Sequence, residues 1–240
     1  MDERPVRRGG PREFEDLMTR GERLATGVYL PVHSVLMPLV LSALSVMSAG
    51  ALDNLTLNAI MYSAGTLFTL LFLHKFLRRS FDVLAENLSQ CVLTLFSALA
   101  MDFALSWLLS LVLALFGIVL GSNANNDAVV GLALEGHNRM FAITVFLAPM
   151  AEEPLFRGLL FGGVRRHSRA AAYVVSVFMF GFYHVWQYLF IFEDWRYLLQ
   201  MLSYVPVSVA LCYSYERSGC IWVPIAFHMF INALSMSLLV

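Results

Sequence analysis

The sequence predicts an all-α membrane protein, a polytopic bundle of about seven transmembrane helices whose N-terminus lies in the cytoplasm. The first supporting observation is composition: 59% of the 240 residues are hydrophobic and only 14% are charged, with a mean hydropathy of +0.69. Soluble domains hold about 45–50% apolar and about 25% charged residues, so this chain has too few polar side chains to cover a soluble surface. The other two observations are the lengths of the apolar stretches and the distribution of Lys and Arg between them.

A helix that spans a bilayer needs about 20 mostly apolar residues, and seven stretches of the chain meet this requirement. The polar residues 1–26, before the first stretch, are expected to form a cytoplasmic leader. Residues 121–138 are rich in Gly, Asn and Ala, and we expect them to form a mobile external loop. The predicted spans are 27–50, 55–74, 88–120, 140–163, 170–190, 197–215 and 221–240.

Lys and Arg residues alternate between the two sides of this predicted bundle. Thirteen of the sixteen lie in the leader and in the loops after the second, fourth and sixth spans, two lie in the other loops, and Arg157 lies inside a span. Because Lys and Arg concentrate on the cytoplasmic side, we expect an integral protein of a bacterial plasma membrane with its N-terminus inside and its C-terminus outside. No basic stripe with interleaved aromatic residues is present, so nucleic acid is not an expected partner. The three cysteines form no C-x-x-C motif and predict neither a disulfide framework nor a thiolate metal site.

Ionisable side chains inside the predicted spans mark the candidate functional site, because such groups are costly in lipid and by default functional. The fourth span contains three of them: Glu152, Glu153 and Arg157. Glu153 and Arg157 are four residues apart on one helix face, so we expect them to pair and to orient the site. Glu152 points about 100° away from this pair and stays free for chemistry.

Three polar side chains on two other spans are predicted to meet Glu152. They are His184 on the fifth span and, four residues apart on the seventh, His228 and Asn232. At about 1.5 Å per residue from the cytoplasmic loops, all four groups lie in the middle third of a core about 30 Å thick.

A carboxylate in an apolar cavity can act as a general base on water, and imidazole and amide groups can donate to a developing oxyanion. No serine or cysteine occupies an equivalent position, so attack by water fits better than an acyl-enzyme. The same residues also offer ligands to a divalent metal such as zinc, with Glu152, His184 and His228 as the candidate ligands. From the residues alone, both mechanisms stay open.

Three motifs occur in order on separate predicted spans: Glu152-Glu153-x-x-x-Arg157, Phe180-x-x-x-His184 and His228-x-x-x-Asn232. Together they resemble the CAAX protease and bacteriocin-processing family of intramembrane endopeptidases. The resemblance covers residues 139–240, which would form the catalytic core, while residues 27–138 match only as generic membrane helices.

The resemblance implies an endopeptidase that hydrolyses peptide bonds near the membrane, either of the CAAX type or of the leader and bacteriocin type. By this similarity Glu152 and His184 would activate water, and His228 and Asn232 would stabilise the oxyanion. The family has been described both as metalloproteases and as glutamate-dependent proteases, so the resemblance leaves the metal open. The expected partners are the lipid bilayer and a peptide or membrane-anchored protein substrate.

Two other functions use the same buried groups. One is a non-enzymatic immunity or scaffolding protein of the same fold, which would not need all four catalytic groups intact. The other is a proton-coupled transporter, which the lack of an internal repeat disfavours. Asp102 lies deep in the third span with no motif around it, and for this residue we favour a structural role over contact with the site.

Overall fold

The computed structural model describes residues 14–48 and 51–239, and within these ranges every regular element is a helix and no β-strand occurs. The first half begins with one long rod, in which the π-helical segment Val32–Leu36 joins α1 to α2. Thr19 caps α1 in a reciprocal pair with Glu22, so the helix already begins inside the expected leader. The helices of this half are α1 (Arg20–Pro31), α2 (Met37–Met47), α3 (Asn54–Phe72), α4 (His74–Glu86) and α5 (Leu88–Leu115).

The second half starts with a helical stretch, kinked at Gly136, in which two π-helical segments, Ile143–Leu147 and Pro154–Phe161, separate three α-helices. A 3₁₀ segment, Trp195–Tyr204, later leads directly into α10. The helices of this half are α6 (Ala124–Ala142), α7 (Ala148–Glu153), α8 (Gly162–Arg165), α9 (Arg169–Ile191), α10 (Val205–Ser218) and α11 (Trp222–Leu239).

The prediction of an irregular loop over residues 121–138 is wrong, because α6 occupies most of this segment. Asn123 caps α6 by accepting hydrogen bonds from the backbone N–H groups of Asn125 and Asn126. The abundance of Asn and Gly that suggested a loop is explained by this cap and by a kink at Gly136, where the backbone leaves the helical conformation. Apolar residues between the Asn and Gly residues pack with α3 and form part of the core.

Among the described residues, five helices are long and apolar enough to cross a membrane. They coincide with the first, second, third, fifth and sixth predicted spans. The fourth predicted span carries Glu152, Glu153 and Arg157 in its middle, and the seventh is represented by the shorter apolar helix Trp222–Leu238. The five are Arg20–Met47, Asn54–Phe72, Leu88–Leu115, Arg169–Ile191 and Trp195–Ser218.

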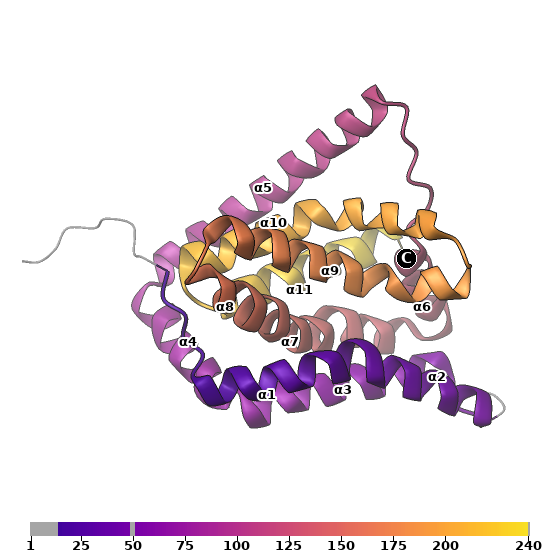
Figure 1. Ribbon diagram of the computed structural model, residues 1–240, viewed down its shortest axis with the longest axis horizontal. Coiled ribbons are helices and arrows are strands. Elements are labelled where there is room, and N and C mark those ends of the chain that lie inside the picture. The colour runs from indigo at the N-terminus through magenta and orange to yellow at the C-terminus, as the bar shows by residue number, and fades with distance from the viewer. Residues whose placement is uncertain (1–13, 49–50, 240) are drawn as a thin grey trace, which may run out of the picture.

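The helices are arranged around α7. Figure 1 shows the rod of α1 and α2 running beside α3 on one side of the molecule, with α9, α10 and α11 on the other. The short helix α7 packs against both α3 and α11, so segments far apart in sequence surround it. The last part of α5 leans away from the other helices (Figure 1).

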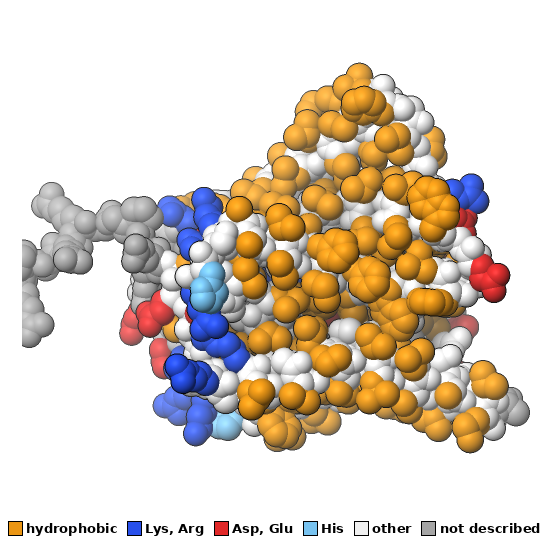
Figure 2. All heavy atoms as spheres, viewed as in Figure 1, with side chains coloured by type: hydrophobic (Ala, Val, Ile, Leu, Met, Phe, Trp, Pro, Cys, Tyr) orange, Lys and Arg blue, Asp and Glu red, His pale blue; other side chains and the backbone are white. Residues whose placement is uncertain are grey.

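The surface agrees with a membrane environment. In Figure 2 apolar side chains cover the middle of the visible face, and Lys and Arg gather at the end where α4 lies. Many large apolar side chains of α2 and α5 are exposed, such as Val46, Phe103 and Trp107. Exposed apolar patches of this extent match lipid rather than water as the surrounding solvent.

Candidate active site

Glu152 and Glu153 lie on α7, which has a π-helical segment on each side and a proline near each end. Pro149 and Pro154 have no backbone N–H and therefore cannot continue the ladder of helical hydrogen bonds. The carbonyl of Thr144, five residues before Pro149, instead accepts a hydrogen bond from Nδ2 of Asn232 at 2.8 Å. The π-helical distortion thus leaves the Thr144 carbonyl free to accept from Asn232. This hydrogen bond holds the side chain of Asn232, which comes from α11, beside α7.

Glu153 is the centre of a buried polar network. Its Oε1 accepts a hydrogen bond from Nη1 of Arg157 at 3.1 Å, as the four-residue spacing predicted, and both side chains are fully buried. The same Oε1 lies 2.7 Å from Nδ1 of His228 on α11. The other terminal nitrogen of Arg157 donates to Oγ of Ser208 on α10 at 2.9 Å, and its guanidinium lies 4.2 Å from the centre of the Phe180 ring. The network therefore ties α7 and the segment after it to three other helices.

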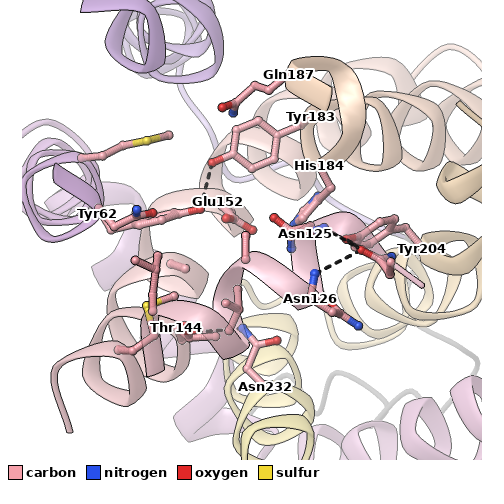
Figure 3. A pocket seen from close by; sticks show the side chains of 18 of the residues that line it. Tyr62, Asn125, Asn126, Thr144, Glu152, Tyr183, His184, Gln187, Tyr204 and Asn232 are labelled. Atoms are coloured by element: carbon pink, nitrogen blue, oxygen red, sulfur yellow. Dashed lines mark hydrogen bonds between the residues drawn. The ribbon is translucent and has the colours of Figure 1, made fainter. Parts of the chain in front are cut away.

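Glu152 takes no part in that network. It is 2% exposed, and its Oε2 makes no hydrogen bond to any residue that the structure describes. The side chain lines a cavity of about 660 Å³. In Figure 3 its carboxylate lies between Tyr62, from α3, and His184, from α9. The prediction that Glu152 points away from the Glu153–Arg157 pair therefore agrees with the arrangement of the helices.

His184, His228 and Asn232 line the same cavity as Glu152, so all four predicted groups meet at one place. Nδ1 of His184 is 2.8 Å from the carbonyl oxygen of Phe180. A carbonyl only accepts, so Nδ1 carries the proton and Nε2 of His184 is left as an acceptor. The ring is stacked on Tyr204, with centroids 4.5 Å apart. Phe180, one turn before His184, therefore contacts two site residues: its carbonyl oxygen accepts from His184, and its ring packs against the guanidinium of Arg157.

Two tyrosines near Glu152, Tyr62 and Tyr183, were not among the predicted site residues. The hydroxyl of Tyr183 donates to that of Tyr62 at 3.4 Å and lies 3.4 Å from Nε2 of His33, which is fully buried. Tyr62 and Tyr183 both line the cavity (Figure 3). His33 is an isolated polar residue of the first predicted span, and nothing in its surroundings along the chain links it to the later motifs. Tyr183 precedes His184 directly, which was the one available signal.

A comparison with known protein families finds a match over the part of the chain that carries the three motifs. Residues 137–234 match the family model described as type II CAAX prenyl endopeptidase Rce1-like. Residues 137–234 form an Rce1-like domain of this family. Membership implies an intramembrane protease. No curated protein and no solved structure gives a significant match.

The Rce1-like domain contains all six predicted site residues, from Glu152 to Asn232. The cavity extends beyond the domain, however, because Tyr62 on α3 and Asp102 on α5 also line it. The helices that precede the domain therefore supply part of the cavity wall, and not only a membrane anchor.

The candidate metal ligands are not grouped as a binding site. Among residues 14–48 and 51–239, no three His, Cys, Asp or Glu side chains are placed so that they could hold one metal ion. Nδ1 of His228 is directed to Glu153, and Nδ1 of His184 to a backbone carbonyl. The ligand set Glu152, His184 and His228 that the sequence suggested is not assembled in this arrangement, and we derive no step through a metal.

Proposed function

We propose that the protein is an intramembrane endopeptidase in which Glu152 and His184 activate a water molecule. The observation that carries this proposal is the buried carboxylate of Glu152, whose Oε2 makes no hydrogen bond to the described residues and whose side chain lines a cavity together with His184, His228 and Asn232. A purely structural carboxylate at this depth would be expected to have a partner, because unpaired polar groups in the membrane interior are costly. A cavity of about 660 Å³ has room for water and for a short extended piece of peptide.

The proposed hydrolysis uses the carboxylate of Glu152 and Nε2 of His184, the two groups of the site that can accept a proton or a hydrogen bond from water. Glu152 accepts a proton from water while the water oxygen bonds to the carbonyl carbon of the scissile peptide. The proton then passes to the peptide nitrogen as the C–N bond breaks, leaving a free carboxyl group and a free amine. Nε2 of His184 is an acceptor, so it can hold the water by accepting its second hydrogen.

In this proposal, side chains of α11 stabilise the negative charge that develops on the substrate carbonyl oxygen. Nδ2 of Asn232 has two hydrogens, of which one is donated to Thr144, so the other is available to the substrate oxygen. Because a carboxylate only accepts, Nδ1 of His228 must carry a proton towards Glu153. His228 can then donate from Nε2 only as an imidazolium, and Glu153 supplies the negative charge that stabilises this form. Arg157 positions Glu153 in turn.

We also propose that the chain crosses the membrane seven times, with a cytoplasmic N-terminus. The helical stretch through α7 and the helix α11 lie among the five longer apolar helices and would span with them. The concentration of Lys and Arg at the end that carries α4 supports placing that end in the cytoplasm of a bacterial cell. The substrate in this proposal is a peptide or membrane-anchored protein that reaches the cavity from the bilayer, either prenylated at a CAAX terminus or cleaved internally as leader peptides are.

The first test measures cleavage of two quenched fluorescent peptides, a prenylated CAAX peptide and an unprenylated apolar peptide, by the full-length protein in detergent. Wild type is compared with Glu152→Gln and with the matched control Glu86→Gln, an exposed glutamate at the end of α4. We expect Glu152→Gln to lose at least about 10²-fold in kcat/KM and the control to keep its activity. Each reaction is repeated with a chelator and with added zinc.

Activity that resists the chelator but not Glu152→Gln supports water activated by the carboxylate alone. Activity lost to the chelator and restored by zinc would show that a metal completes the site and would overturn the metal-free mechanism. Equal cleavage by wild type and Glu152→Gln would refute the assignment of Glu152. No cleavage of either peptide would favour the non-enzymatic immunity or scaffolding function.

A further inference from the structure

Asp102 is a second carboxylate in the wall of the proposed active-site cavity. It is 7% exposed, lines the cavity, and makes no hydrogen bond or ion pair with any residue that the structure describes. It is the fifteenth of 28 residues in α5, so it lies about 20 Å from either end of that helix. An ionisable group at this depth without a partner is by default functional, and the structural role favoured from the sequence finds no partner to support it.

The position of Asp102 on α5 explains how it reaches the cavity. The buried residues of α5 lie on one face, Cys91, Thr94, Ala98 and Asp102, and Asp102 is the last of them. The last part of α5 leans away from the other helices (Figure 1). Ser106, one turn after Asp102, also lines the cavity. Asp102 and Ser106 are therefore the residues by which α5 contributes to the cavity wall.

The described residues that line the cavity include carboxylates but neither Lys nor Arg. The carboxylates are those of Glu152 and Asp102. The buried Arg157 is directed to Glu153 and Ser208, and it is not a lining residue. The other polar lining side chains are mainly amides and hydroxyls, which Asn125 and Tyr204 exemplify in Figure 3. A carboxylate without a partner in such a wall attracts a cation.

We propose that Asp102 is a specificity residue that binds a cationic group of the peptide substrate, an Arg or Lys side chain or a free α-amino group. This inference rests on the proposed protease function and narrows its substrate class to peptides that carry a positive charge near the scissile bond. A hydrogen-bonded ion pair with Asp102 would satisfy the carboxylate when substrate is bound, whereas water in the cavity satisfies it otherwise.

The test measures binding, so that it does not depend on turnover. Full-length protein in nanodiscs carries Glu152→Gln throughout, which removes cleavage and also removes the other carboxylate from the cavity. The probes are ten-residue apolar fluorescent peptides, acetylated and amidated, with one central arginine or its neutral analogue citrulline. A citrulline peptide with a free N-terminus tests whether an α-amino group serves as the cation.

We expect the arginine peptide to bind at least about tenfold more tightly than the citrulline peptide. Asp102→Asn should abolish this preference, and Asp102→Glu, which keeps the charge, should retain it. Asp82→Asn, the same change at an exposed position on α4, should also retain it. Gel filtration of each variant separates loss of preference from loss of fold.

Equal affinities for all three peptides, including no measurable binding of any of them, would overturn the inference. A preference that persists in Asp102→Asn would overturn it as well. A preference that depends on Asp102, in a protein whose wild type cleaves neither peptide, would uphold the cation site and refute the protease function. The cation site is therefore tested by binding and the protease function by cleavage, so that either proposal can fail without the other.

Discussion

Nδ1 of His228 and Oε1 of Glu153 lie 2.7 Å apart, although 75 residues separate them in the chain. The same oxygen also accepts from Arg157, so one carboxylate joins the motif on α7 to the motif on α11. Glu153 thereby does two things at once: it neutralises a guanidinium and fixes the proton of an imidazole. Oε2 of both glutamates makes no hydrogen bond among the described residues, but only Glu153 has an Oε1 that is bonded to an arginine and a histidine. This contrast separates the positioning residue from the proposed base.

Replacing Arg157 with Met should strongly destabilise the fold. The guanidinium is fully buried and bonds to Glu153 and Ser208, so its removal leaves a buried carboxylate with only His228 as a partner. Breaking a buried pair by removing one member costs about 3–5 kcal/mol. Thermal unfolding in detergent measures the loss, with Arg166→Met, an exposed arginine of the following loop, as the control. A loss no larger than that of the control would show that Arg157 does not hold this network together.

Replacing Glu152 with Gln should leave stability unchanged or increase it while abolishing activity. The reason is that Oε2 of Glu152 makes no hydrogen bond among the described residues, so the neutral amide removes a buried charge and breaks no hydrogen bond at this oxygen. Functional residues often lower the stability of a fold, because activity requires groups whose interactions in the folded state are unfavourable. The midpoint of thermal unfolding should be at or above that of wild type. A clear decrease would indicate that Glu152 has a structural partner and would weaken its assignment as the base.

The motifs located the site because they lie on regular helices. The pairing of Glu153 with Arg157 and the separate direction of Glu152 follow from helical periodicity, and the structure has both. The contact between His228 and Glu153 was not predictable, because it depends on how α11 packs against α7. Spacing within one helix could be derived, but packing between helices could not.

Local composition also misled the prediction in one place. Asn and Gly in residues 121–138 resemble a loop, yet Asn123 serves as a helix cap and Gly136 as a kink within α6. Tyr62, a cavity residue from the first half, and His33, which lies beside Tyr183, were missed for a different reason. Both are isolated polar residues in apolar helices, and only packing between helices, such as that of α3 against α7, brings them near the site.

Replacing Tyr183 with Phe should lower activity more than stability. Its hydroxyl lies 3.4 Å from both the Tyr62 hydroxyl and Nε2 of His33, and these distances are long for hydrogen bonds. We expect a loss of about threefold to tenfold in kcat/KM, as for one weak hydrogen bond near the reacting groups. Tyr197→Phe, outside the cavity, is the matched control. Unchanged activity in Tyr183→Phe would mean that the tyrosines only fill space beside Glu152.

Replacing Gly65 with Val should separate α3 from α7. A Cβ atom at Gly65 would lie 2.6 Å from Cβ of Ala151 and 2.9 Å from Cε1 of His33, so the absence of a side chain is what lets the two helices approach. Overpacking of this kind costs about 1–3 kcal/mol, and the displacement acts next to Glu152. Both unfolding temperature and kcat/KM should therefore fall. Gly27→Val on α1, where a Cβ meets nothing within 4 Å, should change neither by a comparable amount. If Gly65→Val behaved like Gly27→Val, the close contact of α3 with α7 would not be needed to place the proposed base.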